Sequence, residues 1–368
     1  MGFNNYKILI IKLGAIGDLL MTTPAIRALK KAYPTTHISL LAGKSSKMTV
    51  NGNQYIDELI ECDDYIIYKA RFLQKARYAL SLFYLLRKKK FDAVIVFHRD
   101  WRFNFFAFLC GIPERVGFDR NGEGRFLTKK VMVIGIKHNI DQYLEVVKAI
   151  GIHDDGRDMD FAISKEAENV ADKMLQTGGV GKGDIVIGIL AGGASNIKTD
   201  MPIKRWPLEN YIELSNQMAA DGCKVILLGA ESDRPNADAI LKHVPEGLNR
   251  GRVSHNILDL TGKTTLEETA AVMKRCNLIV AHDSGPMHLA SAVGVPVISI
   301  FGPTDPREYY PLSPNSYYFW NVENIKCAPC YKDGEFPDCQ NPICMNAVTV
   351  EQVYQKIGEL IIKRGVNN

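Results

Sequence analysis

The sequence predicts an α/β protein made of two domains, each with a parallel sheet. Short aliphatic and β-branched runs alternate with segments of helical periodicity, which is the pattern of βαβ units. The alternation begins at residue 7 and starts again at residue 185, and the polar stretch GIHDDGRDMD at 151–160 lies between the two parts. A chain of 368 residues is long enough for two domains. We therefore expect a first domain at 1–160, a second at 161–348 and a terminal helix at 349–368.

The composition is that of an ordinary soluble globular protein, with 46% hydrophobic and 23% charged residues. A net charge of +4 argues against a nucleic-acid binder. No apolar run approaches the roughly 18 residues of a membrane-spanning helix, and the chain enters a strand pattern without a charged-then-apolar leader. We expect a cytoplasmic protein whose eight cysteines are thiols or metal ligands rather than disulfides.

The first domain opens with a strand, KILII at Lys7–Ile11, a glycine turn, LGAIGD at 13–18, and a helical stretch to residue 32. The turn is neither GxGxxG nor a P-loop, so a dinucleotide cofactor is poorly supported. Asp18 is a carboxylate at a strand-to-helix turn, where it either caps the helix or acts chemically. Pro24 predicts a kink or a restart of this helix.

The rest of the first domain alternates in the same way. We expect strands at 37–42, 56–61, 91–97 and 115–117, and helices at 75–90 and 103–110. The helix at 75–90, KARYALSLFYLLRKKK, has an apolar body and a basic end. We favour packing on the core, with the cations stabilised at the helix C-terminus. The alternative is that it lies on an anionic membrane surface.

The second domain repeats the alternation. We expect helices at 164–176, 208–220, 234–243 and 265–275, and strands at 185–190 and 224–228. The stretch 277–306 contains two apolar runs that each end in a polar cluster, and ligands of parallel sheets bind at such strand ends. Ser284 and Gly285 open a helix whose free N–H groups suit a phosphate, with Asp283 beside them. The alternative is that Asp283 or Ser284 only caps this helix and that His288 is a packed interior residue.

Four sequence motifs follow one another along the chain. They are LGAIGD…TTP at 13–24, a Gly-Gly loop with KRWP at 204–207, GAE at 229–231, and DSGPMH at 283–288 with FGPTDP at 301–306. With these the chain resembles glycosyltransferase family 9, the ADP-heptose:lipopolysaccharide heptosyltransferases. The resemblance implies a GT-B fold, in which two Rossmann-like domains face each other across a cleft. The first domain would bind the acceptor and the second the nucleotide sugar, and the terminal helix would cross back to the first domain.

The resemblance also implies a reaction and partners. Heptose would pass from the ADP-sugar donor to a lipopolysaccharide inner-core acceptor, with inversion and with no cofactor required for catalysis. We expect no nucleic-acid partner, and peripheral contact with the cytoplasmic face of the inner membrane. The alternatives are another GT-B enzyme, such as a UDP-sugar transferase or an epimerase, and a non-catalytic nucleotide-sugar binder.

The residue roles below are those that the resemblance implies. Asp18 would be the general base, with Gly17 beside it in the substrate-binding turn, and Lys204 would contact the leaving diphosphate. Ser284 and Gly285 would bind phosphate, Asp283 the sugar hydroxyls, and Glu231 the adenosine ribose, with His288 near the same pocket.

The loop between Gly193 and Lys204 is longer than in the family. Lys198 therefore competes with Lys204 for the diphosphate, and Ser195 and Thr199 are equivalent hydroxyl candidates. Arg99 and Arg102 follow a strand at which family members carry acceptor-contacting residues.

Four cysteines form a C-x2-C-x8-C-x4-C pattern at Cys327, Cys330, Cys339 and Cys344. Such a group can bind zinc, and the site would be structural because four thiolates leave no open position. The alternatives are reduced thiols or disulfides formed after purification.

Overall fold

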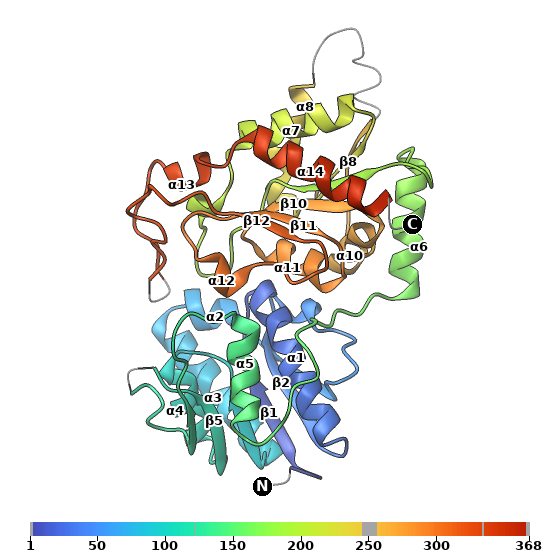
Figure 1. Ribbon diagram of the computed structural model, residues 1–368. Coiled ribbons are helices and arrows are strands. Elements are labelled where there is room, and N and C mark those ends of the chain that lie inside the picture. Colours follow the sequence, from blue (N-terminus) through green and yellow to red (C-terminus); the bar gives the residue numbers. More distant parts are fainter. Residues whose placement is uncertain (1–2, 121, 245–255, 333–334, 366–368) are drawn as a thin grey trace. The chain divides into compact units, whose positions relative to one another are not determined.

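The computed structural model describes residues 3–120, 122–244, 256–332 and 335–365 (Figure 1). The chain divides into two compact units, Met1–Ala162 with Asn196–Lys198, and Ile163–Ser195 with Thr199–Asn368. The domain boundary expected between 160 and 161 lies two residues from this division. Among the described helices, none is long and apolar enough to cross a bilayer.

The first unit, called unit 1 below, contains a six-stranded parallel sheet in the order β3-β2-β1-β4-β5-β6. This is the Rossmann order, in which the direction of winding reverses between the first and fourth strands. The strands are β1 (Lys7–Ile11), β2 (His37–Gly43), β3 (Glu58–Cys62), β4 (Ala93–Val96), β5 (Glu114–Phe118) and β6 (Lys129–Val131). The helices are α1 (Ile16–Ala32), α2 (Asp64–Lys69), α3 (Phe72–Lys89), α4 (Trp101–Leu109) and α5 (Asn139–Lys148), with a short 3-10 turn η1 (Lys47–Thr49).

The core of unit 1 follows from the apolar strands. Residues 8–11 of β1 are fully buried, as expected for a parallel strand covered on both faces. Leu9 and Ile11 pack in one cluster with Leu82 and Leu86 of α3 and with α4, while α1 and α5 pack against each other. The sheet therefore has helices on both faces.

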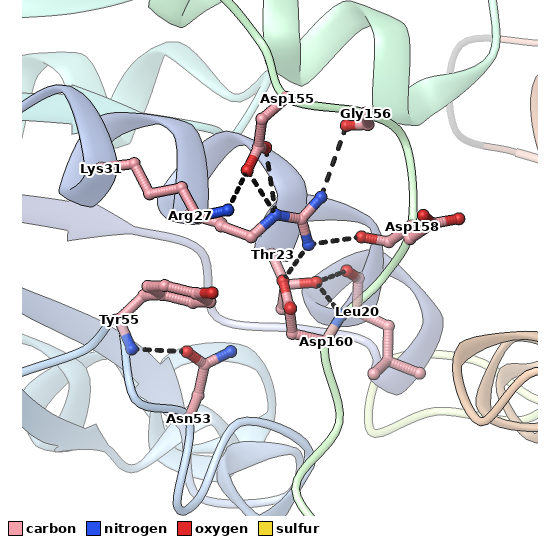
Figure 2. A network of polar contacts seen from close by, with 10 residues as sticks. All are labelled: Leu20, Thr23, Arg27, Lys31, Asn53, Tyr55, Asp155, Gly156, Asp158 and Asp160. Carbon is pink, nitrogen blue, oxygen red and sulfur yellow. Dashed lines mark hydrogen bonds and ion pairs between the residues drawn. The ribbon is translucent and has the colours of Figure 1, made fainter.

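Helix α1 runs through Pro24 without a break, so the predicted restart does not occur. Proline has no N–H, which leaves the carbonyl four residues earlier, that of Leu20, without its helical partner. The Thr23 hydroxyl donates to this carbonyl at 2.8 Å and accepts the backbone N–H of Asp160 at 2.8 Å (Figure 2). Thr23 thus replaces the missing helical bond and ties α1 to the segment that ends unit 1.

Arg27 of α1 holds the same segment (Figure 2). Its guanidinium lies 3.0 Å from the Asp155 carboxylate and 2.5 Å from that of Asp160, and it also donates to the Asp158 carbonyl at 2.7 Å. Lys31 adds a second cation 2.6 Å from Asp155. Burial raises the pKa of Asp160 despite the guanidinium, whereas the hydrogen bonds from Lys31 and Arg27 outweigh burial at Asp155 and lower its pKa.

The second unit, unit 2, contains another six-stranded parallel sheet, in the order β12-β11-β10-β7-β8-β9. Counted within the unit, this is the same order as in unit 1. The strands are β7 (Val186–Leu190), β8 (Lys224–Leu227), β9 (Ile257–Asp259), β10 (Leu278–His282), β11 (Val297–Ile300) and β12 (Tyr317–Phe319). The helices are α6 (Lys165–Thr177), α7 (Leu208–Ala220), α8 (Arg234–Lys242), α10 (Leu266–Arg275), α11 (Gly285–Ala292), α12 (Pro306–Tyr309), α13 (Ile343–Asn346) and α14 (Val350–Gly365), with 3-10 turns η2 (Pro202–Lys204) and η3 (Glu231–Asp233).

The two parallel sheets confirm the predicted α/β class. The Ser164 hydroxyl caps α6 by accepting the Ala167 N–H, as its position predicts. Helix α14 is grouped with unit 2, and the expected crossing back to the first domain stays a prediction. Its side chains Val353 and Ile357 are buried in the core of that unit, and the helix packs on α7, because the apolar stripe of α14 complements that core.

Candidate active site

The reversal point of the unit 1 sheet brings four polar side chains together. Lys12 follows β1, Asp18 lies in the first turn of α1, His98 follows β4, and Tyr143 lies on α5. The Lys12 ammonium is 3.3 Å from the Asp18 carboxylate and donates to the Tyr143 hydroxyl at 2.9 Å. The Tyr143 hydroxyl is 3.4 Å from the same carboxylate oxygen, Oδ1 of Asp18.

The second oxygen of Asp18 accepts the Ala15 N–H at 3.2 Å. Asp18 therefore caps α1 with one oxygen and keeps the other in the polar cluster, and its chemical role stays a prediction. Its side chain is 36% exposed, whereas that of Lys12 is 8% exposed. The Asp18 side chain is therefore partly accessible, while the ammonium beside it is buried.

Electrostatics keep this carboxylate ionised. Burial opposes the charge on Asp18, but Lys12 and the Ala15 N–H outweigh it and lower the pKa of the carboxyl. Burial likewise disfavours the ammonium of Lys12, but Asp18 and Tyr143 raise its pKa. The Lys12–Asp18 pair is therefore charged on both sides at neutral pH.

His98 supports the turn from behind. Its Nε2 accepts the Leu13 N–H at 3.2 Å, and its ring stacks on Phe103 with the ring centroids 4.1 Å apart. Burial, reinforced by Lys12, lowers the pKa of His98 to about 3, so the imidazole is neutral. A neutral ring that accepts at Nε2 carries its proton on Nδ1.

The two arginines after β4 are already engaged within unit 1. Arg99 donates to the Asn139 side chain at 2.9 Å and to the Gln142 side chain at 2.5 Å. Arg102 lies 2.5 Å from the Asp100 carboxylate and is mostly exposed. Arg99 thus connects the end of β4 to α5. Contact of Arg99 or Arg102 with an acceptor stays a prediction.

The reversal point of the unit 2 sheet holds the second polar cluster. Asp283 follows β10, and its carboxylate lies 2.6 Å from the Lys204 ammonium and accepts the Thr304 hydroxyl at 2.7 Å. The Asp283 side chain is 5% exposed and that of Lys204 is 13% exposed. Burial opposes ionisation of Asp283, but Lys204 and the Thr304 hydrogen bond lower its pKa.

Helix α11 begins directly beside this ion pair. Ser284 is its N-cap by backbone geometry, but its hydroxyl makes no capping bond. The Ser284 hydroxyl is buried and has no hydrogen-bond partner within the described chain. A buried hydroxyl without a partner, at a helix N-terminus and next to a lysine, is suited to an anionic ligand.

His282 and His288 flank this cluster. His282 is fully buried and its Nδ1 lies 3.0 Å from the Tyr211 hydroxyl. Burial lowers the pKa of His282 to about 3, with Lys204 adding to the effect. His288 is buried one turn into α11 and interacts electrostatically with Asp283.

Asp233 organises the glycine turn after β7. One of its oxygens accepts the Gly193 N–H at 3.0 Å and the other accepts the Ala230 N–H at 2.9 Å. A Cβ on Gly192 would lie 2.2 Å from the Asp233 carboxyl carbon, so only glycine fits there. Glu231 follows β8 with its side chain 76% exposed and 3.7 Å from Arg234, which leaves its carboxylate open to solvent.

The predicted candidates thus fall into two groups. Unit 1 gathers Gly17 and Asp18. Unit 2 gathers the residues around the start of α11, namely Lys204, Asp283, Ser284, Gly285 and His288, with Glu231 one strand further along.

The long loop before Lys204 also has a defined form. Ser195 is exposed and forms an isolated antiparallel bridge with Asp200, and Thr199 is exposed as well. Lys198 lies in the segment 196–198, which is grouped with unit 1, whereas Lys204 lies at the Asp283 cluster.

The cysteine motif does not form a metal site in the described residues. Its four members are free thiols, and within the described ranges no group of three or more His, Cys, Asp or Glu side chains is arranged to hold a metal ion. Burial raises the pKa of Cys344 to about 11, and the nearby Cys330 and Cys327 add to the shift. Cys330 interacts electrostatically with Cys327 and Cys339, and Cys344 with Cys330 and Cys327, so the thiols are neighbours and the zinc site stays a prediction.

Several residues of the two clusters are absent from the sequence-based candidates. Lys12 is visible in the sequence as a charge directly after an apolar strand. Tyr143 lies on a helix that was not predicted, although Ile140, Tyr143, Leu144 and Val147 have helical spacing. Thr304 lies in the FGPTDP stretch at 301–306, but its hydrogen bond to Asp283 is visible only in the folded structure.

Two Rossmann-type units with polar clusters at their reversal points are typical of α/β proteins that bind nucleotides. The family model for glycosyltransferase family 9 (heptosyltransferase) matches residues 79–339. The chain belongs to this family and is a glycosyltransferase.

Relatives agree over nearly the whole chain. Lipooligosaccharide heptosyltransferase 2 of Haemophilus influenzae is 27% identical over 376 residues, which cover 97% of this chain and 100% of that protein. The crystal structure of a family 9 glycosyl transferase from Veillonella parvula has a TM-score of 0.79 and 25% identity, and covers 99% of each chain. The structure of the Escherichia coli ADP-heptose lps heptosyltransferase II has a TM-score of 0.74 and 20% identity, covering 98% of this chain and 99% of that one. These likenesses support a GT-B-like fold.

Proposed function

We propose that this enzyme transfers heptose from ADP-heptose to an inner-core lipopolysaccharide acceptor. The names of the relatives support this donor and this acceptor. The single observation that carries the donor half is the start of α11, where the buried Ser284 hydroxyl lacks a partner beside Lys204. A diphosphate would supply acceptor oxygens to that hydroxyl, to the free N–H groups of the helix and to the ammonium.

The proposed reaction is one displacement with inversion. The acceptor hydroxyl oxygen forms a bond to the anomeric carbon while the bond from that carbon to the ADP oxygen breaks. The hydroxyl proton passes to Asp18, and ADP leaves with the bonding electron pair. Asp18 suits the role of base because its lowered pKa keeps it ionised and because its side chain is partly exposed.

The leaving group also needs stabilisation, because negative charge grows on the diphosphate in the transition state. Lys204 and the N-terminus of α11 provide positive charge for the leaving diphosphate. In other transferases a divalent cation supplies this charge. We therefore propose a metal-independent transfer. Asp283 would hold Lys204 in place and accept hydrogen bonds from sugar hydroxyls, and Glu231 would accept those of the ribose.

A lipid-anchored acceptor would confine the reaction to a membrane surface. We propose that the enzyme works at the cytoplasmic face of the inner membrane, in peripheral contact with it.

The test of this function has two parts. Thermal stabilisation by ADP, UDP and NAD at equal concentration identifies the nucleotide, since a ligand that binds the folded state raises Tm by mass action. Transfer from ADP-heptose is then measured with the wild type and with Asp18→Asn. We expect ADP alone to stabilise, and the variant to keep that stabilisation but to lose transfer by roughly 10²- to 10⁴-fold.

The control is Asp172→Asn, which removes an exposed carboxylate that pairs with Arg275 on the surface of unit 2. It should transfer at the wild-type rate. Stabilisation by UDP in place of ADP would replace the donor with a UDP-sugar, and unchanged transfer by Asp18→Asn would remove Asp18 as the base.

A further inference from the structure

Helix α3 has an outer face that its position in unit 1 does not explain. Leu82 and Leu86 are the buried residues of α3 and pack on the sheet with Leu9 and Ile11. Successive helical residues are about 100° apart, so the direction of Leu82 differs from that of Leu73 by about 180°. A surface helix normally carries polar side chains on the face opposite the core.

On α3 that opposite face is apolar. Leu80 and Tyr84 point in nearly the same direction as Leu73, because they are seven and eleven residues further along a helix with 3.6 residues per turn. These three side chains are 74% (Leu73), 53% (Leu80) and 62% (Tyr84) exposed. The helix therefore has two apolar faces, of which the structure covers one.

Cations border the exposed face. Arg77 and Lys88 lie beside the Leu73–Leu80–Tyr84 stripe by the same helical geometry, and both are exposed. The sequence of α3 contains Lys75, Arg77, Arg87, Lys88 and Lys89 and no Asp or Glu. We call the set Leu73, Arg77, Leu80, Tyr84 and Lys88 the outer face of α3.

A neighbouring helix extends this surface. The end of α4 lies beside the end of α3, because a Cβ on Gly111 would sit 3.6 Å from the Arg87 guanidinium. Both helices pack in the same core cluster, through Leu86 and Ala107. Phe108 and Leu109 at that end of α4 are exposed. The sequence of α4, WRFNFFAFL, also lacks acidic residues.

We propose that the outer face of α3 docks unit 1 on an anionic phospholipid surface. Its chemistry selects this occupant, because aliphatic and tyrosine side chains enter the headgroup boundary while arginine and lysine contact lipid phosphates. A face that carries Arg77 and Lys88, on a helix whose own sequence has no carboxylate, is complementary to a negative bilayer. This inference reverses the preference for a purely core-facing helix at 75–90, and it deepens the proposed function, on which it rests for the membrane-anchored acceptor.

Vesicles without any acceptor separate this inference from the proposed function. Binding of the full-length enzyme is measured by co-sedimentation with vesicles of phosphatidylcholine alone, and with vesicles of equal parts phosphatidylcholine and phosphatidylglycerol. We expect binding to the anionic vesicles only, weakened by salt. The double variants Leu80→Ser with Tyr84→Ser, and Arg77→Glu with Lys88→Glu, should each bind at least roughly tenfold more weakly.

Matched controls on unit 2 are Ile362→Ser, an exposed aliphatic residue of α14, and Lys173→Glu, an exposed lysine of α6. Both should bind as the wild type does. All substituted side chains are exposed, so far-UV circular dichroism and Tm should match the wild type. ADP-heptose transfer to a delipidated acceptor should also be unchanged in every variant, which reports separately on the proposed function.

Three results would overturn the proposal. One is equal binding of the wild type to neutral and anionic vesicles. Another is wild-type binding by both double variants. The third is a wild-type enzyme that does not bind vesicles but forms a dimer in size-exclusion chromatography, when the double variants do not form this dimer. That result would make the outer face of α3 a self-association surface.

Discussion

The Lys12 ammonium lies 3.3 Å from the Asp18 carboxylate, and the Tyr143 hydroxyl contacts both. The proposed base therefore works against a fixed neighbouring cation. Such a cation keeps the carboxylate ionised but also makes it a weaker proton acceptor. The Asp18 carboxylate therefore stays ionised down to low pH, but it is a weaker proton acceptor than an ordinary aspartate.

Removal of this cation should move the pH profile of the reaction. In Lys12→Met the pKa of Asp18 rises, because the main interaction that lowers it is gone. The ionised base is populated above its pKa, so the acid limb of kcat/KM should move to higher pH. The measurement is kcat/KM against pH for the wild type, Lys12→Met and Lys137→Met, which removes another carboxylate-paired lysine of unit 1. An acid limb that stays in place in Lys12→Met would show that another group controls it.

Lys204 and Lys198 can be separated by substitution. Lys204→Met leaves the buried Asp283 carboxylate without its cation, which should cost unit 2 about 3 kcal/mol and abolish stabilisation by ADP. Lys198→Met should leave both properties near the wild type. Thermal unfolding with and without ADP measures both effects. The opposite pattern would transfer the diphosphate contact to Lys198.

The same ion pair sets a pH dependence. The folded protein lowers the pKa of Asp283, so its contribution to the free energy of unfolding is present at neutral pH. It is lost as the pH falls below the ordinary range of an aspartate. The wild type should therefore lose more stability on acidification than Lys204→Met does.

Thr23 should matter more than its neighbour Thr22. Thr23→Val leaves both the Leu20 carbonyl and the Asp160 N–H without a partner, so we expect a loss of about 2 kcal/mol. Thr22→Val also removes a hydroxyl bond, to the Leu19 carbonyl, but that carbonyl keeps its regular helical partner. Urea unfolding of the two isosteric variants tests the difference. Equal losses would mean that the proline position needs no substitute bond.

Gly43 supports the turn that carries Asp18. A Cβ at Gly43 would lie 2.4 Å from the Leu13 carbonyl oxygen and 2.6 Å from the Asp64 carboxylate. Gly43→Ala should therefore lower stability by roughly 1–3 kcal/mol and reduce kcat, because Leu13 must move. Gly183→Ala is the control, since nothing lies within 4 Å of its added Cβ. A variant Gly43→Ala as active as the control would show that the turn tolerates displacement.

Local signals in the sequence predicted much of this fold. Apolar runs identified β1, β4, β7 and β10 because strands covered on both faces are nearly continuous in hydrophobicity. The three-residue strands β6, β9 and β12 were missed, since so few residues carry no periodicity. Helix α5 was missed despite its spacing, and Tyr143 was missed with it.

The candidate site was predictable to the extent that its residues follow strands. Asp283 and Ser284 follow an apolar run directly, and Asp18 ends the glycine turn that follows another. The pairing of Lys204 with Asp283 joins residues far apart in the chain and depends on how the loop after β7 folds back. The partnership of Lys12 with Asp18 depends on the orientation of side chains in the turn. Neither ion pair can be predicted from the residues next to it in the sequence.

The two sheets have separate hydrophobic cores. The cluster around Leu9 draws on residues between 9 and 112, and the cluster around Ile187 on residues between 187 and 361. Within the described residues, each of these two clusters is built from side chains of its own unit, and we expect the two cores to melt separately. A calorimetric scan should then resolve two heat-absorption peaks, and a van't Hoff enthalpy from one merged peak would understate the calorimetric enthalpy. Nucleotide bound at α11 would shift one peak and leave the other where it was, so the scan itself would report which half of the chain holds the donor.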